Sequence, residues 1–189
     1  MGKNRITDMF CTQGLALMNR SLKNVVADPS NLDARSDVMF AAYCAGMAIN
    51  TTGTAAAHAI QSPMSAFGHT PHGIGVGALL PYVMRFNLPY CTAQFTEIAQ
   101  VLGVAEEGQT EDEQAKAGIT RVEALLEATG TPLEIASLGI EPAHFNQIAT
   151  SSVKAARLVL NNPAPMTVES VTALLGRAVA GDRNWWKKP

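Results

Sequence analysis

The chain has 189 residues, a length that predicts one domain, with two small domains as the other option. Apolar residues make up 47% and aromatic residues only 6%, and this Ala-rich composition favours packed helices over a β-sandwich. The formal charge of −2 gives no reason to expect nucleic acid or an anionic membrane as a partner.

The cysteine pattern points to a reducing compartment. The three cysteines are an odd number and none forms a CxxC pair, so we expect neither a disulfide framework nor a zinc ribbon. The longest apolar stretch, residues 38–49, is too short to cross a bilayer, and the first residues lead into no signal-type apolar core. We therefore predict a cytoplasmic protein with no membrane partner.

Apolar residues at helical spacing predict a first helix over residues 7–27, ended by residues 28–31. A second helix follows a cap at Asp33 or Ser36 and continues to Ile49. Because this second helix is apolar nearly all round, we expect it to be buried.

A short Ala-rich helix is predicted through Gln61, after which Pro63 forces a turn or kink and residues 64–71 form a loop. His72 opens another apolar helix that continues to Phe86. Glycines alternate at positions 73, 75 and 77 of this helix, where they weaken helix propensity. We therefore expect a close backbone approach at these glycines.

The second half of the chain predicts further helices. Thr110 and Glu113 form a capping box for a helix that ends at Ala128, and Thr167 caps a last helix. The other segments are helices over residues 95–102, 131–138 and 141 to about 155 or a little beyond, a loop over residues 161–165 and the last helix to residue 179. No stretch alternates as a strand would. The predicted fold is all-α, as a single helical domain over residues 1–189.

Three of the four histidines lie within fifteen residues, among small or apolar neighbours. His58 and His72 would be about 21 Å apart on one straight helix. They can meet if His58 ends one helix, residues 62–71 fold back, and His72 starts the next helix. A neutral imidazole is the commonest metal ligand, and this pair is therefore a candidate metal site. The other interpretation is a pair of core histidines bonded to backbone carbonyls. We expect His69, in the loop, to be solvated or structural, and His144 to be an ordinary residue of a surface helix.

Several segments resemble the iron-containing (group III) alcohol dehydrogenases. They are residues 53–58, Pro63, residues 71–73 and residues 79–87, with support from residues 45–50 and 162–167. The resemblance covers almost the whole chain. It implies the all-helical, metal-binding C-terminal domain of that family, with no Rossmann-like nucleotide-binding domain in these residues.

The resemblance also implies a site. Members of the family bind iron or zinc with an Asp and a His four residues apart on one helix, and with two histidines at the positions of His58 and His72. The first pair has no match here, because Asp8 is followed four residues later by Thr12. Ser62 stands where many relatives have His or Tyr close to the nicotinamide and the substrate.

The implied activity is NAD(P)-dependent oxidoreduction of small alcohols or aldehydes, assisted by a metal acting as a Lewis acid. This chain offers two of four ligands and no cofactor domain. We therefore predict a truncated or split dehydrogenase that does not catalyse the reaction alone, with NAD(P) bound only if a nucleotide-binding partner is present. The alternative is a non-catalytic helical binding or interaction module that keeps a residual two-histidine metal site.

A domain that normally packs against another exposes apolar surface when it is alone, and such surface tends to be covered by association. We therefore expect a homo-oligomer or a complex with a nucleotide-binding partner domain.

Overall fold

The computed structural model describes residues 3–186, which are helical and contain no strand. The all-α prediction is confirmed. None of the helices in this range is long and apolar enough to cross a lipid bilayer. The cysteines Cys11, Cys44 and Cys91 are all free, as their spacing predicts.

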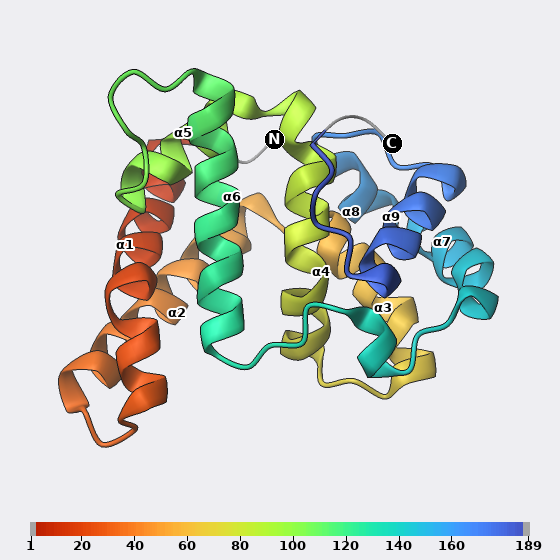
Figure 1. Ribbon diagram of the computed structural model, residues 1–189, viewed down its shortest axis with the longest axis horizontal. Coiled ribbons are helices and arrows are strands. Elements are labelled where there is room, and N and C mark those ends of the chain that lie inside the picture. The colour runs from red at the N-terminus through yellow and green to blue at the C-terminus, as the bar shows by residue number, and fades with distance from the viewer. Residues whose placement is uncertain (1–2, 187–189) are drawn as a thin grey trace. The chain divides into compact units, whose positions relative to one another are not determined.

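The helices form two compact units (Figure 1). The first unit contains α1 (Arg5–Ala27), α2 (Leu32–Thr52), α5 (Thr92–Val101) and α6 (Glu111–Ala128). The second contains α3 (Ala56–Gly68), α4 (His72–Asn87), η1 (Leu88–Tyr90), η2 (Ile135–Leu138), η3 (Pro142–His144), α7 (Phe145–Val153), α8 (Ala156–Asn161) and α9 (Val168–Ala180). This division describes how the residues pack and does not test the single-domain prediction.

In the first unit, α1 lies side by side with α2 (Figure 1). Small residues make this close approach possible, because a Cβ atom on Gly14 would lie only 3.4 Å from both the Ala41 carbonyl oxygen and the Cys44 Cβ. Asn19 ties α1 to the rest of the unit. Its amide nitrogen donates to the Leu102 carbonyl at 3.1 Å, and its amide oxygen accepts from Arg121 Nε at 2.7 Å.

The prediction that the second helix is buried is wrong. Helix α2 packs through a stripe of small residues that includes Ala41, Cys44 and Ala48, while its opposite face is exposed. Leu32 is 78% exposed and Met39 72%. A helix that is apolar all round must be covered on every side to be buried, and within the described residues the packing of α2 covers only one side.

The second unit has a continuous apolar core to which α3, α4, α7 and α9 contribute. Two buried amides help to position α3. Asn87 and Asn162 donate to each other's side-chain oxygens at 3.0 and 2.8 Å, and the Asn162 oxygen also accepts from the backbone N–H of Ala56 at 3.4 Å. These bonds connect the end of α4 and the segment before α9 to the first turn of α3.

The predicted loop over residues 64–68 is wrong, because α3 continues through Pro63 to Gly68. A proline inside a helix removes one hydrogen bond and costs about 3 kcal/mol. Ile60 and Met64, on either side of it, are fully buried, and burial of such side chains contributes roughly 1.5–3 kcal/mol each. The core therefore offsets the proline.

The elements after residue 130 agree less well with the sequence predictions. Only Ile135–Leu138 of the predicted helix 131–138 is helical, as a 3-10 turn, and the predicted helix 141–155 is a 3-10 turn followed by α7. Helix α8 was not predicted at all. Both predicted caps are present, with Thr110 bonded to Glu113, and Thr167 bonded to Ser170.

We expect Thr110→Ala to destabilise the chain by about 1 kcal/mol, because the N–H of Glu113 would lose its side-chain acceptor at 3.3 Å. Urea unfolding followed by circular dichroism measures this change. Thr120→Ala is the matched control, since Thr120 is exposed in the interior of the same helix and Ala is the better helix former. Equal stabilities of the two variants would contradict the predicted capping role.

Candidate metal centre

His58 and His72 come together in the second unit. His58 lies in the first turn of α3 and His72 is the first residue of α4. The three residues between the helices turn the chain back, beginning with His69 in the left-handed conformation at φ 47°. The imidazole ring centroids of His58 and His72 are 5.1 Å apart and the rings are tilted by 59°. The chain therefore folds back between the two histidines and His72 starts a helix, as expected. The expectation that His58 ends a helix is wrong, because His58 lies near the start of α3 and residues 62–68 are helical.

The two rings have different surroundings. His58 is partly buried and His72 is exposed. Burial lowers the pKa of His58 below its ordinary value of 6.5, and the positive charge that His72 can carry lowers this pKa further. His58 is therefore neutral near pH 7, which is the state in which an imidazole nitrogen can bind a metal.

A third side chain, Gln61, joins the two histidines. It lies three residues after His58 on α3, and its carboxamide oxygen is 2.7 Å from Nδ1 of His72. The sequence analysis missed this residue. The available signal was a polar amide one helical turn after a candidate ligand in an otherwise apolar helix.

The other sequence-selected residues do not join this group. Ser62 is exposed on α3, immediately after Gln61. His69 is the C-cap of α3 and is also exposed. His144 stacks on Phe67 with 4.4 Å between ring centroids, and its Nδ1 accepts from the backbone N–H of Glu141 at 3.2 Å. His69 is thus exposed to solvent, which is one of the two positions expected of it, and His144 packs against Phe67 outside the candidate site.

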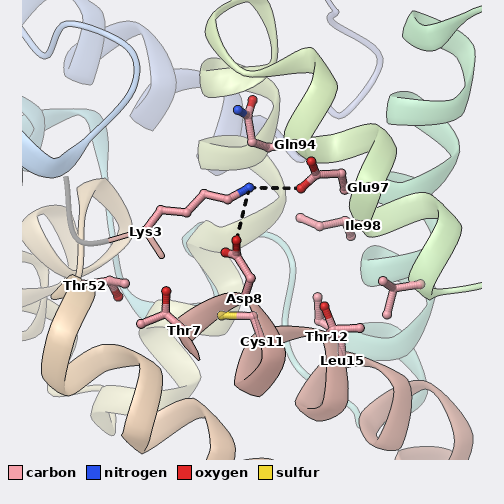
Figure 2. A pocket seen from close by; sticks show the side chains of 11 residues that line it. Lys3, Thr7, Asp8, Cys11, Thr12, Leu15, Thr52, Gln94, Glu97 and Ile98 are labelled. Atoms are coloured by element: carbon pink, nitrogen blue, oxygen red, sulfur yellow. Dashed lines mark hydrogen bonds and ion pairs between the residues drawn. The ribbon is translucent and has the colours of Figure 1, made fainter. Parts of the chain in front are cut away.

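Asp8 belongs to the first unit, where it lines a pocket of about 400 Å³ (Figure 2). Figure 2 shows the ammonium of Lys3 between two carboxylates, 3.1 Å from Glu97 and 3.9 Å from Asp8. Cys11 lies in the same pocket, where burial raises the pKa of its thiol. The Asp8 carboxylate is therefore engaged in an ion pair with Lys3 within its own unit.

Among residues 3–186, no group of three or more His, Cys, Asp or Glu side chains lies close enough to hold a metal ion. Catalytic zinc sites usually have three protein ligands and one open position. The imidazole pair fits part of such a site and falls short of a complete one.

The sequence model for the C-terminal part of the Fe-containing alcohol dehydrogenases matches residues 1–179. The chain belongs to the iron-containing alcohol dehydrogenase family. Its match to the C-terminal part agrees with the helical fold, and the family prediction is confirmed.

Two relatives show how far the sequence similarity extends. The 1,3-propanediol dehydrogenase of Klebsiella pneumoniae is 30% identical over 175 residues, which cover 93% of this chain and 45% of that protein. Alcohol dehydrogenase 4 of Saccharomyces cerevisiae is 31% identical over 177 residues, which cover 93% and 44%. The chain thus spans less than half the length of these relatives.

Solved structures agree with this assignment. A 1,3-propanediol oxidoreductase superposes with a TM-score of 0.89 at 29% identity, covering 93% of this chain and 46% of that one. An alcohol dehydrogenase from Oenococcus oeni superposes with a TM-score of 0.88 at 31% identity, covering 93% and 45%.

We expect His58 in the metal-free chain to titrate below pH 6.5 in an NMR titration, because burial disfavours its charged form. This pKa shift also sets the direction in which stability changes with pH. Unfolded His58 takes up a proton more readily than folded His58, so the free energy of unfolding decreases as the pH falls from about 6.5 through the lower pKa of folded His58. His58→Gln identifies the resonance and removes this part of the pH dependence. A midpoint at or above 6.5 for His58 would contradict the expectation.

Proposed function

We propose that residues 1–189 supply the helical, metal-binding half of an NAD(P)-dependent alcohol or aldehyde oxidoreductase, with His58 and His72 as two of its metal ligands. The observation that supports this best is the contact of the two imidazoles, 5.1 Å between centroids, in a chain of the iron-containing alcohol dehydrogenase family. Its relatives bear names such as 1,3-propanediol dehydrogenase and lactaldehyde reductase.

The chain's own residues would do two things at this site. His58 and His72 would hold iron or zinc through neutral imidazole nitrogens, which the lowered pKa of His58 favours. The bound metal would polarise the oxygen of a small alcohol or aldehyde during hydride exchange with NAD(P). Ser62, next to Gln61, would then lie where an exposed hydroxyl could contact the substrate.

We further propose that these 189 residues do not catalyse the reaction alone. Two imidazoles are fewer ligands than a catalytic metal site uses, and residues 3–186 bring no third one to them. No glycine-rich dinucleotide fingerprint follows a strand in this sequence, so NAD(P) would be bound by a nucleotide-binding partner. A cytoplasmic location is part of this proposal and rests on the cysteine pattern.

Metal analysis of the purified chain tests the ligand assignment. After loading with Fe²⁺ or Zn²⁺ and removal of excess metal, we expect wild type to retain metal, and His58→Ala and His72→Ala each to lose most of it. His69→Asn is the matched control, because Asn also tolerates the left-handed conformation at that exposed position. Equal metal content in all four proteins would overturn the assignment.

The same preparation is assayed for oxidation of ethanol and propane-1,3-diol with NAD and with NADP. Metal without turnover supports the proposal, whereas metal with turnover overturns the claim that the chain is inactive alone. The absence of a third close ligand favours a second candidate function, a non-catalytic interaction module with a residual two-histidine site. Absence of retained metal in wild type would favour that module without the site.

The exposed face of α2 supports association with a second copy of this chain. Six large apolar side chains of α2 are exposed: Leu32, Met39, Phe40, Tyr43, Met47 and Ile49. The Phe40 and Tyr43 rings stack with their centroids 6.1 Å apart. Large apolar side chains exposed along one helix are a feature of interaction surfaces.

We therefore expect a dimer or larger oligomer in size-exclusion chromatography with light scattering. Met39→Glu should shift the population towards monomer, because a carboxylate in an apolar interface is costly to desolvate. Leu160→Glu is the matched control, since Leu160 is an exposed apolar residue on α8 of the second unit. A wild-type chain that is wholly monomeric at tens of micromolar would contradict self-association.

A further inference from the structure

The contact between Gln61 and His72 determines which nitrogen of the His72 ring carries the proton. The carboxamide oxygen of Gln61 lies 2.7 Å from Nδ1 of His72. A carbonyl oxygen can only accept a hydrogen bond, so Nδ1 must carry the proton. In a neutral imidazole the other nitrogen, Nε2, then holds the lone pair.

We propose that Gln61 is a positioning residue that selects the Nδ1–H tautomer of His72 and so keeps Nε2 available as a metal ligand. The inference rests on the proposed metal-binding function of His58 and His72. Histidines that bind metals nearly always donate their other ring N–H to an acceptor, which sets both ring orientation and ligand basicity. Here the acceptor is a neutral amide from the neighbouring helix.

The fold leaves Gln61 little freedom to do anything else. Gln61 is only 2% exposed. It lies one helical turn after His58, so one face of α3 supplies both the first proposed ligand and the acceptor for the second. A Cβ atom on Gly75 would lie 2.8 Å from Cγ and 3.3 Å from Nε2 of Gln61. Because Gly75 has no side chain, the side chain of Gln61 can occupy the space beside it.

This contact also explains one of the alternating glycines. Close approach was expected at positions 73, 75 and 77, and the structure has it at Gly75 but not at Gly73, where a Cβ would meet nothing within 4 Å. Because Gly73 and Gly75 lie on the same helix, they form a matched pair. Adding one methyl group at Gly75 displaces Gln61, and adding it at Gly73 leaves Gln61 in place.

The direct test is the tautomer of His72 in the metal-free chain. Long-range ¹H–¹⁵N NMR at a pH where both imidazoles are neutral distinguishes a protonated from a bare ring nitrogen. We expect bare Nε2 and protonated Nδ1 in wild type and in Gly73→Ala, and loss of this single tautomer in Gln61→Leu and Gly75→Ala. Gln61→Glu keeps an acceptor oxygen and should retain the wild-type tautomer. Bare Nδ1 in wild type, or an unchanged tautomer in Gln61→Leu, would overturn the inference.

The second readout is the affinity for Zn²⁺ or Co²⁺. We expect Gln61→Leu to bind roughly 10- to 100-fold more weakly than wild type, the usual effect of removing an acceptor behind a metal-bound histidine. The double variant Gln61→Ala with Gly75→Ala refills the space with a methyl group, so it should keep the fold and still bind weakly. Wild-type affinity in a folded double variant would overturn the positioning role.

The two readouts also distinguish this inference from the function on which it rests. If wild type shows the Nδ1–H tautomer that Gln61→Leu loses, yet binds no metal, the proposed metal function fails while the effect of Gln61 on the ring is established. If wild type binds metal through His58 and His72 but Gln61→Leu changes neither tautomer nor affinity, the metal function holds and the inference fails.

Discussion

A buried pair of asparagine amides helps to position the first turn of α3, the helix that carries His58. Asn87 and Asn162 bond to each other twice, and Asn162 also accepts from the first turn of α3. Asn87 is the last residue of α4, the helix that starts with His72. The two helices that carry the imidazoles are therefore connected at a second place besides the short turn between them. An unpaired buried amide costs free energy, so this arrangement tolerates little variation.

The two faces of α2 show how composition can mislead about burial. Its small residues pack against α1, and its larger apolar residues remain exposed. A helix of this kind is stable only if one side supplies enough burial for the monomer, and the other side is then free for a partner. The chain spans less than half the length of its relatives, and that makes an uncovered apolar face unsurprising in these residues taken alone.

Local signals in the sequence predicted well wherever a few neighbouring residues determine the structure. The Thr110–Glu113 capping box and the helix start at His72 are examples, and the spacing of His58 and His72 correctly required a fold-back. Predictions failed where distant packing decides. Pro63 remains inside α3 because Ile60 and Met64 are buried around it, and the sequence alone could not rank those effects. Gln61 was missed because its partner is His72, on another helix.

Because the pair would supply only two ligands, the side chains that surround the two histidines have a larger effect on metal binding than they would in a complete site. A complete site with three or four ligands tolerates some disorder in each, because the others hold the metal. With two imidazoles, each must be neutral and must present the correct nitrogen before binding. Burial favours the neutral form of His58, and the Gln61 carboxamide fixes the proton of His72 on Nδ1. Under the proposed metal function, the pair would be better prepared for a metal than two unconstrained surface histidines, and ligands from outside these residues would complete the site.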